Sequence, residues 1–144
     1  MNRVLVDTNI WAYLLGIGED TAKREILIEV FKKLAEEEWQ VFICSQVCKE
    51  FVRVGTEKYG YTREYMEHEI ERLKKIANVI YEDCEDVRTA IELREHYNLQ
   101  FWDAVVVAVA INNRIPYILT EDITYRIISF KDQQVELIDP FDRA

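Results

Sequence analysis

The 144-residue chain has few of the residues that interrupt or cross-link a fold: four glycines, two prolines and three cysteines. With no glycine-, serine- or proline-rich tract, it contains no candidate linker between domains. Cys44, Cys48 and Cys84 are odd in number and form no Cys-x2-Cys pair, so we expect buried, reduced thiols rather than disulfides or a zinc site. The sequence therefore predicts one continuous domain over residues 1–144.

Histidines and long hydrophobic runs are also scarce. His68 and His96 each lie in a charged segment with no second histidine one helical turn away, so we expect both on the surface. The longest apolar run, residues 104–111, is far shorter than the roughly 20 residues of a membrane span. The amino terminus lacks the apolar core of a signal peptide. We therefore expect a cytoplasmic protein that makes no membrane contact.

Positive charge is in short supply, because 18 lysines and arginines face 27 aspartates and glutamates, for a net charge of −9. Nonspecific affinity for nucleic acid comes mainly from basic side chains that neutralise phosphates. This composition disfavours a protein that holds nucleic acid by charge alone. Convergence of several carboxylates on one cation would explain part of the negative charge, and the cation would then bridge to phosphate.

Short apolar runs typical of strands alternate with segments of helical periodicity. The strand-like runs are residues 4–6, 41–44, 79–81, 117–119 and 135–138. Apolar stripes predict one helix around residues 26–34, capped by Asp20 or Thr21, and another around residues 66–77, capped by Thr62. A third helix follows Asp83. Strands that alternate with helices predict an α/β fold with a mainly parallel sheet covered on both faces.

Acidic residues recur where ligands bind in such folds, beyond the carboxyl ends of the strands. Asp7 directly follows the first strand, and Asp122 follows the fourth. Glu50 lies on the helix that Ser45 opens after the second strand. Asp103 begins the most hydrophobic helix of the chain, residues 104–111. These four carboxylates are the candidate functional residues.

The two acids in the amino-terminal half of the chain, Asp7 and Glu50, also have ordinary structural explanations. Asp7 can cap the following helix, although Thr8 or Asn9 could do so equally well and leave Asp7 free to point at a cleft. Glu50 falls on the apolar stripe of its helix, where a carboxylate is costly unless it is paired or bound to a cation. Its alternative role is a salt bridge to Lys49, Arg53 or another helix.

The other two acids likewise leave alternatives open. Asp103 suits the first turn of its helix, because the helix dipole favours a negative charge there. Of Glu121 and Asp122, at least one could simply face water in a turn. The functional hypothesis therefore depends on the four positions taken together.

Five segments between Val4 and Phe141 resemble, in order, the motifs of PIN-domain ribonucleases, especially VapC-type toxins. They are VLVDTNIWAYLL, the glutamate of SQVCKEFVRV, FWDAVVVAVA, ILTEDI and VELIDPF. The resemblance implies a PIN-like three-layer α/β/α sandwich with a five-stranded, mainly parallel sheet. It also implies a catalytic and metal-binding quartet and three supporting polar residues. The quartet is Asp7, Glu50, Asp103 and Asp122, and the supporting residues are Thr8, Asn9 and Thr120.

The resemblance further implies an RNA substrate, a homodimer and a small antitoxin partner that blocks the cleft. Three positions depart from the family's frequent residues. Asn113 stands where glycine is common, and Gln134 and Asp139 replace a frequent glycine and asparagine. Asparagine tolerates the left-handed turn conformation, so Asn113 is a mild departure. None of the three is an acidic-quartet position.

Carboxylate clusters favour hard divalent ions, so Mg²⁺ or Mn²⁺ is the expected cofactor. Such an ion lowers the pKa of water, so no histidine base is required. Arg53 and Arg126 are candidate phosphate contacts.

One rival function is an aspartyl-phosphate phosphotransferase, but Asn9 stands where that class usually has a second aspartate. Another rival is a catalytically silent PIN-like module that acts through protein contacts.

Overall fold

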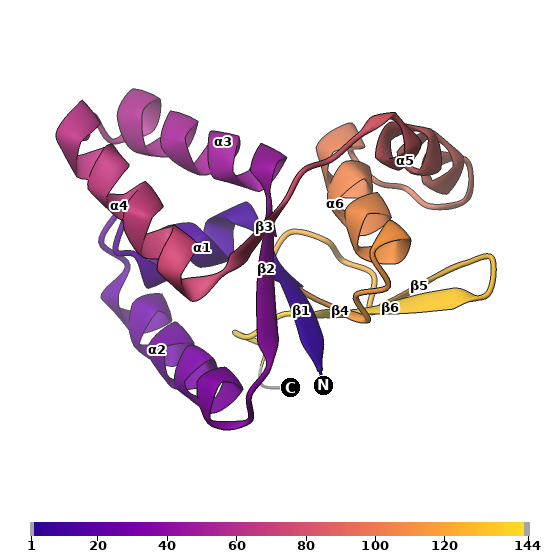
Figure 1. Cartoon of the computed structure of the whole chain (residues 1–144), viewed down its shortest axis with the longest axis horizontal. Helices are drawn as coiled ribbons and strands as arrows, with labels where there is room; N and C mark the ends of the chain where they lie inside the picture. Colours follow the sequence, from indigo (N-terminus) through magenta and orange to yellow (C-terminus); the bar gives the residue numbers. More distant parts are fainter. Residues whose placement is uncertain (1, 143–144) are drawn as a thin grey trace.

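A computed structural model describes residues 2–142; Met1, Arg143 and Ala144, which the predicted domain includes, lie outside the described residues. Strands and helices alternate through most of the chain (Figure 1). In order, the elements are β1 (Arg3–Val6), α1 (Thr8–Leu14), α2 (Thr21–Glu36), β2 (Gln40–Cys44), α3 (Ser45–Arg53), a π-helical turn (Val54–Lys58), α4 (Arg63–Ile76), β3 (Asn78–Ile80), α5 (Cys84–His96), α6 (Phe101–Asn112), β4 (Tyr117–Leu119), β5 (Ile127–Phe130) and β6 (Gln133–Ile138).

The sheet has the strand order β3-β2-β1-β4-β6-β5. All neighbouring pairs are parallel except β5 with β6, so the prediction of a mainly parallel sheet is confirmed. The predicted number of five strands is wrong, because β5 adds a sixth at the edge. β5 and β6 form a hairpin whose loop is Lys131 and Asp132, with Lys131 at a φ of 54°. That loop lacks the Asn-Gly or Asp-Gly pair that marks such hairpins in a sequence.

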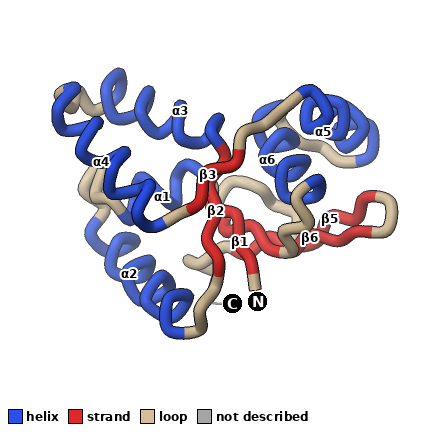
Figure 2. Tube along the Cα trace, viewed as in Figure 1, coloured by secondary structure: helices blue, strands red, loops and turns tan. Residues whose placement is uncertain are grey.

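The helices cover both sides of the strands, which confirms the α/β/α arrangement. In Figure 1, α1 to α4 lie to the left of β1, β2 and β3, and α5 and α6 lie to the right, above the β5–β6 hairpin; Figure 2 shows β1, β2 and β3 between these two groups of helices. Every residue of α6 from Ala104 to Ile111 is buried, as its continuous hydrophobicity predicts. This helix fixes the position of Asp103 against the core.

The predicted helix starts are confirmed by side-chain hydrogen bonds. Asp20 accepts from the backbone N–H of Lys23 at the start of α2, and Thr62 caps α4. At α5, Asp83 accepts from the N–H groups of the first turn while Asp86 accepts from the N–H of Asp83, forming a capping box. Each cap satisfies backbone donors that the helix itself leaves unpaired.

The expectation of buried thiols is wrong at one cysteine, and the turn after α6 does not use the left-handed conformation at Asn113. Asn113 follows α6 with a φ of −103°, and the left-handed residue is the next one, Arg114, with a φ of 55°. The guanidinium of Arg3 donates to the carbonyl oxygens of both residues, which fixes this turn. Cys44 is buried and Cys48 half-buried, as free thiols, but Cys84 is exposed rather than buried.

The two histidines lie at the surface, as the sequence predicts. His68 and His96 are both exposed. Burial raises the pKa of the Cys44 thiol to about 12, so this thiol stays protonated at neutral pH. Within residues 2–142, no helix is both long and apolar enough to cross a membrane.

Candidate active site

The candidate site forms at the carboxyl edge of the central strands. β1 pairs in parallel with β2 on one side and β4 on the other, so the residues that follow these strands emerge at the same edge. The N–H of Asp7 donates to the carbonyl of Leu119 at 3.0 Å, which ties the end of β1 to the end of β4. α3 begins directly after β2 and carries Glu50 to the same edge.

Asp7 both caps a helix and belongs to the acidic cluster. It is 6% exposed, and its two oxygens accept hydrogen bonds from the Thr8 N–H at 2.8 Å and the Thr120 hydroxyl at 2.9 Å. The idea that Thr8 or Asn9 would cap α1 and leave Asp7 free is therefore wrong. Burial raises the pKa of Asp7, its two hydrogen-bonded neighbours oppose that rise, and the negative charge of Glu50 adds to it.

Glu50 is held by neutral donors. One carboxylate oxygen accepts from the Thr8 hydroxyl at 2.9 Å, and the other accepts from the side-chain amide of Gln46. Among the described residues no lysine or arginine forms an ion pair with Glu50, so the alternative of a salt bridge to Lys49 or Arg53 is not realised. Thr8 thus joins the two acids, because its N–H binds Asp7 and its hydroxyl binds Glu50.

Asp103 links the four acids electrostatically. It lies in the first turn of α6 but does not cap the helix, because Gln100 occupies the cap position. The pKa of Asp103 is raised to about 6, first by desolvation and then by the negative charges of Asp7, Asp122 and Glu50. Within residues 2–142 its carboxylate accepts no hydrogen bond from a side chain. It is the least compensated of the four acids.

Asp122 and Glu121 face different partners. The amide of Asn9 donates to Asp122 at 2.6 Å, whereas Glu121 accepts from the Tyr13 hydroxyl at 2.8 Å and pairs with Lys23. Desolvation raises the pKa of Asp122, and the charges of Asp7 and Glu121 raise it further. Asp122 is therefore the member of this pair that is coupled to Asp7 and Asp103.

The structure brings the three predicted supporting polar residues to the acids, since Thr8 binds Asp7 and Glu50, Asn9 binds Asp122 and Thr120 binds Asp7. The two candidate phosphate contacts are not brought to the acids. Arg53 lies 3.9 Å from Glu57, and Arg126 lies 3.3 Å from Asp142. Both arginines are exposed.

Three residues at the edge of the site were missed. Lys23 neutralises Glu121 from 98 positions away in the chain, so no local pattern marks it. Glu82, in the loop after β3, accepts from the Ser45 hydroxyl at 2.7 Å and from the N–H of Gln46 at 3.2 Å, and so caps α3 from outside. Gln46 itself precedes Glu50 by one helical turn, a spacing that could have indicated their contact.

The donor chemistry of the site fits a hard, hydrated cation. No lysine or arginine in residues 2–142 forms an ion pair with Asp7, Glu50, Asp103 or Asp122. The described side chains also contain no group of three or more acids, histidines or cysteines placed to hold an ion by themselves. Mg²⁺ commonly binds through one or two carboxylates and keeps several waters. The carboxylate oxygens of the four acids are therefore of the ligand type that such an ion takes, without a preformed cage of three ligands among the described residues.

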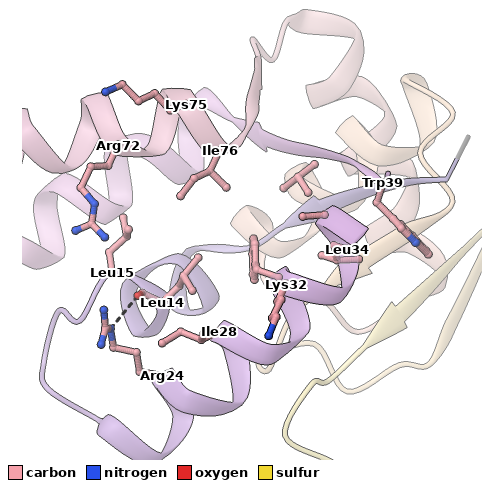
Figure 3. A pocket seen from close by; sticks show the side chains of 13 residues that line it. Leu14, Leu15, Arg24, Ile28, Lys32, Leu34, Trp39, Arg72, Lys75 and Ile76 are labelled. Carbon is pink, nitrogen blue, oxygen red and sulfur yellow. Dashed lines mark hydrogen bonds between the residues drawn. The ribbon is translucent and has the colours of Figure 1, made fainter. Parts of the chain in front are cut away.

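A concave feature lies between α2 and α4, and none of the four acids lines it. It is an apolar cavity of about 610 Å³, and Figure 3 shows its lining. Ile28 and Ile76, each 41% exposed, contribute to its apolar surface. Its basic lining residues are Arg24, Lys32, Arg72 and Lys75. We call this feature the α2–α4 groove; four cations beside an apolar surface stand out in a chain of net charge −9.

Comparison with known proteins gives one family and several similar folds. The family model for the PIN domain matches residues 4–131. No curated protein sequence matches the chain significantly. A chain of a toxin–antitoxin complex from Klebsiella pneumoniae is 26% identical, with 83% of this chain and 86% of that chain covered and a TM-score of 0.57.

Two further solved structures share the fold at lower identity. VapC20 from Mycobacterium tuberculosis, described as a toxin that cleaves the sarcin-ricin loop, is 22% identical over 83% of this chain and 89% of that chain, with a TM-score of 0.64. A chain of VapBC2 from Rickettsia felis, bound to a DNA fragment from its promoter, is 17% identical over 83% of this chain and 88% of that chain, with a TM-score of 0.66.

Proposed function

The chain belongs to the PIN domain family, and from this premise we propose that it is a Mg²⁺- or Mn²⁺-dependent endoribonuclease that hydrolyses RNA phosphodiester bonds. The observation that carries the proposal is the group of four carboxylates, Asp7, Glu50, Asp103 and Asp122, which share one strand edge without a cationic partner. These four are the proposed catalytic and metal-binding residues. When bound, the divalent ion would lower the pKa of water and stabilise charge on the leaving oxygen.

The protein side chains would prepare this site. Asp103 has the carboxylate most available to an ion, because none of the described side chains donates to it. Thr8 and Thr120 fix the orientation of Asp7, and Asn9 fixes that of Asp122. Hydrogen bonds from neutral donors orient these carboxylates without cancelling their charge, which is what a cation site needs.

The products follow from the absence of histidine at the site. His68 and His96 are exposed on α4 and α5, and among the described residues no hydrogen bond joins either of them to the four acids. Histidine-assisted attack by the RNA 2′-hydroxyl is therefore disfavoured relative to attack by water. Cleavage should leave 5′-phosphate and 3′-hydroxyl ends.

Substrate contacts are proposed at exposed side chains. Arg53 and Arg126 remain candidates for phosphate, each of which would exchange a surface ion pair for RNA. Trp102, which precedes Asp103, is 57% exposed and packs edge-on against Phe101. We propose this exposed indole, next to Asp103 in the sequence, as a group on which an RNA base could stack.

The test is cleavage of a fluorescent RNA with Mg²⁺, Mn²⁺, Ca²⁺ or EDTA, together with analysis of the product ends. We expect turnover with Mg²⁺ and Mn²⁺, less with Ca²⁺, and none in EDTA. RNA affinity should depend on the metal and fall only shallowly with salt, because few basic contacts release counterions. Tight binding in EDTA with a steep salt dependence would instead favour a catalytically silent binding module.

We also propose that the chain is the toxin of a toxin–antitoxin pair and acts in the cytoplasm as a homodimer. The two similar structures that contain toxin–antitoxin components support this assignment of the partner. The α2–α4 groove is the proposed docking surface, because its apolar lining and the cations Arg24, Lys32 and Lys75 complement an amphipathic helix that carries acidic residues.

The partner proposal can be tested by co-expressing the chain with the product of a small reading frame adjacent to its gene. Co-expression should give a stable complex. Ile28→Lys and Ile76→Lys should each weaken the complex while free nuclease activity stays unchanged. If both variants form the complex as well as the wild-type chain does, the groove is ruled out. Sedimentation equilibrium of the free chain would test the homodimer.

A further inference from the structure

Gln46 carries an unsatisfied polar atom inside the site. The residue is 6% exposed in the first turn of α3. Its side-chain NH₂ donates to one oxygen of Glu50, one turn further along the helix. Its carbonyl oxygen, Oε1, is the one buried side-chain nitrogen or oxygen in residues 2–142 without a hydrogen-bond partner. Leaving such an acceptor unpaired costs about 1–3 kcal/mol.

The orientation of the Gln46 amide follows from its neighbour. An ionised carboxylate only accepts hydrogen bonds, so the NH₂ group must face Glu50 and the carbonyl oxygen must point elsewhere. Turning the amide over would place two acceptors in contact. The bond to Glu50 thus fixes Oε1 close to the Glu50 carboxylate, because Oε1 belongs to the same amide group as the donating nitrogen.

Three donors at this end of the site are already engaged. The Thr8 hydroxyl donates to Glu50, and the Ser45 hydroxyl donates to Glu82. The N–H of Gln46 also donates to Glu82. A buried polar atom without a partner in the described part of the chain ordinarily pairs with an ordered water, so a water is the partner that we expect for Oε1.

We propose that Gln46 is a positioning residue that holds Glu50 through its NH₂ group and, through its carbonyl oxygen, accepts a hydrogen bond from a water in the hydration shell of the divalent ion. This inference rests on the proposed function, because it takes Glu50 as a ligand of that ion. The observation that carries this inference beyond the proposed function is the single unpaired oxygen beside Glu50. Mg²⁺ keeps several of its waters when bound to proteins, so a donor of this kind is available.

The first test measures metal affinity without RNA. Mn²⁺ is titrated into the wild-type chain, Gln46→Met and the control Gln134→Met, which makes the same change at an exposed position of β6, and free Mn²⁺ is followed by electron paramagnetic resonance. Removing an outer-shell partner typically weakens metal binding ten- to a hundredfold, and we expect a loss of about that size for Gln46→Met. The control should bind as the wild type does. Thermal melting in EDTA checks that both variants fold.

The possible outcomes separate this inference from the proposed function. Equal Mn²⁺ affinity of Gln46→Met and the wild type would overturn the role of Gln46 and leave the metal site standing. Failure of the wild type to bind Mn²⁺ would overturn both.

A second measurement needs no variant and decides the matter if Gln46→Met does not fold. The side-chain amide signals of Gln46 are followed by nuclear magnetic resonance in the ¹⁵N-labelled wild-type chain during a Mg²⁺ titration. We expect them to shift with the same midpoint as the backbone signal of Asp103. Unchanged Gln46 signals at saturating Mg²⁺ would overturn the proposal.

Discussion

Two glutamates on successive helices show how differently this protein treats its acids. Glu69 of α4 lies 2% exposed near the α2–α4 groove, and one guanidinium nitrogen of Arg72 donates to both of its oxygens at 3.0 Å. Glu50 of α3, in the acidic cluster, accepts only from the neutral groups of Thr8 and Gln46. Glu69 is thus compensated within the chain, and Glu50 is left to a ligand from outside.

The same contrast separates two adjacent residues after β4. Glu121 pairs with Lys23, whose amine also lies 4.6 Å from the centre of the Tyr13 ring. Asp122 is bound only by the neutral amide of Asn9. An acid with a cation of its own has a structural role, whereas a set of acids without one stores electrostatic repulsion that a metal can relieve. This difference suggests five experiments.

The largest expected effect is on catalysis by the uncompensated acids. Asp103→Asn and Asp7→Asn should each lower kcat for RNA cleavage at least about a hundredfold, because losing a ligand charge removes several kcal/mol of transition-state stabilisation. Both changes keep the size of the side chain, so circular dichroism should report an intact fold. Asp132→Asn, in the exposed β5–β6 turn, is the matched control. Full activity in both site variants would refute the site.

The largest expected effect on stability is at the compensated glutamate. Arg72→Met should lower the free energy of unfolding by about 2 kcal/mol, because it leaves Glu69 buried without its cation. Arg88→Met is the control, since Arg88 forms only an exposed pair with Glu85. Urea unfolding of the two variants measures the difference. Similar losses in both would mean that the Glu69 pair contributes no more than a surface pair.

The neighbours Glu121 and Asp122 should respond in opposite ways. Asp122→Asn should reduce cleavage about tenfold or more with little change in melting temperature. Glu121→Gln should leave cleavage nearly unchanged and lower the melting temperature, because Lys23 loses its partner. The reverse pattern would make Glu121 the functional acid.

The pH dependence of stability should reveal the repulsion directly. The pKa of Asp103 is raised from 3.8 to about 6 in the folded chain, so the folded state binds more protons than the unfolded state between these values. The free energy of unfolding of the protein in EDTA should therefore fall as pH rises from about 4 to about 6. Asp103→Asn should flatten this fall, and so should saturating Mg²⁺. An equal slope in the variant would assign the effect to other groups.

The smallest expected effect is on the stability of the metal-free protein after Glu50→Gln. The change removes one charge from the cluster, so the melting temperature in EDTA should stay the same or rise slightly. Glu69→Gln, which removes a charge that Arg72 compensates, should lower it. A marked drop for Glu50→Gln would show that Glu50 serves the fold rather than a metal.

Much of the local structure could be predicted because its causes lie within a few residues. Asp20, Thr62 and Asp83 cap helices as expected, and the continuous apolar run of α6 is buried. β5 could not be predicted, because its hairpin turn of Lys131 and Asp132 carries no glycine or asparagine. β5 lies at the edge of the sheet, and its residues alternate between exposed and buried although the sequence IISF does not alternate between polar and apolar.

The sequence by itself determined the order of the helices and of every strand except β5, and the positions of four acids beside strand ends or at a helix start. Periodicity, caps and motif order are local properties of the chain. Only the tertiary structure decided which acids are compensated. Lys23 reaches Glu121 across 98 residues, Thr120 reaches Asp7 across 113, and Asn9 reaches Asp122 across 113. Burial and charge compensation depend on distances through space, and those distances exist only once the parallel strands have brought their carboxyl ends together.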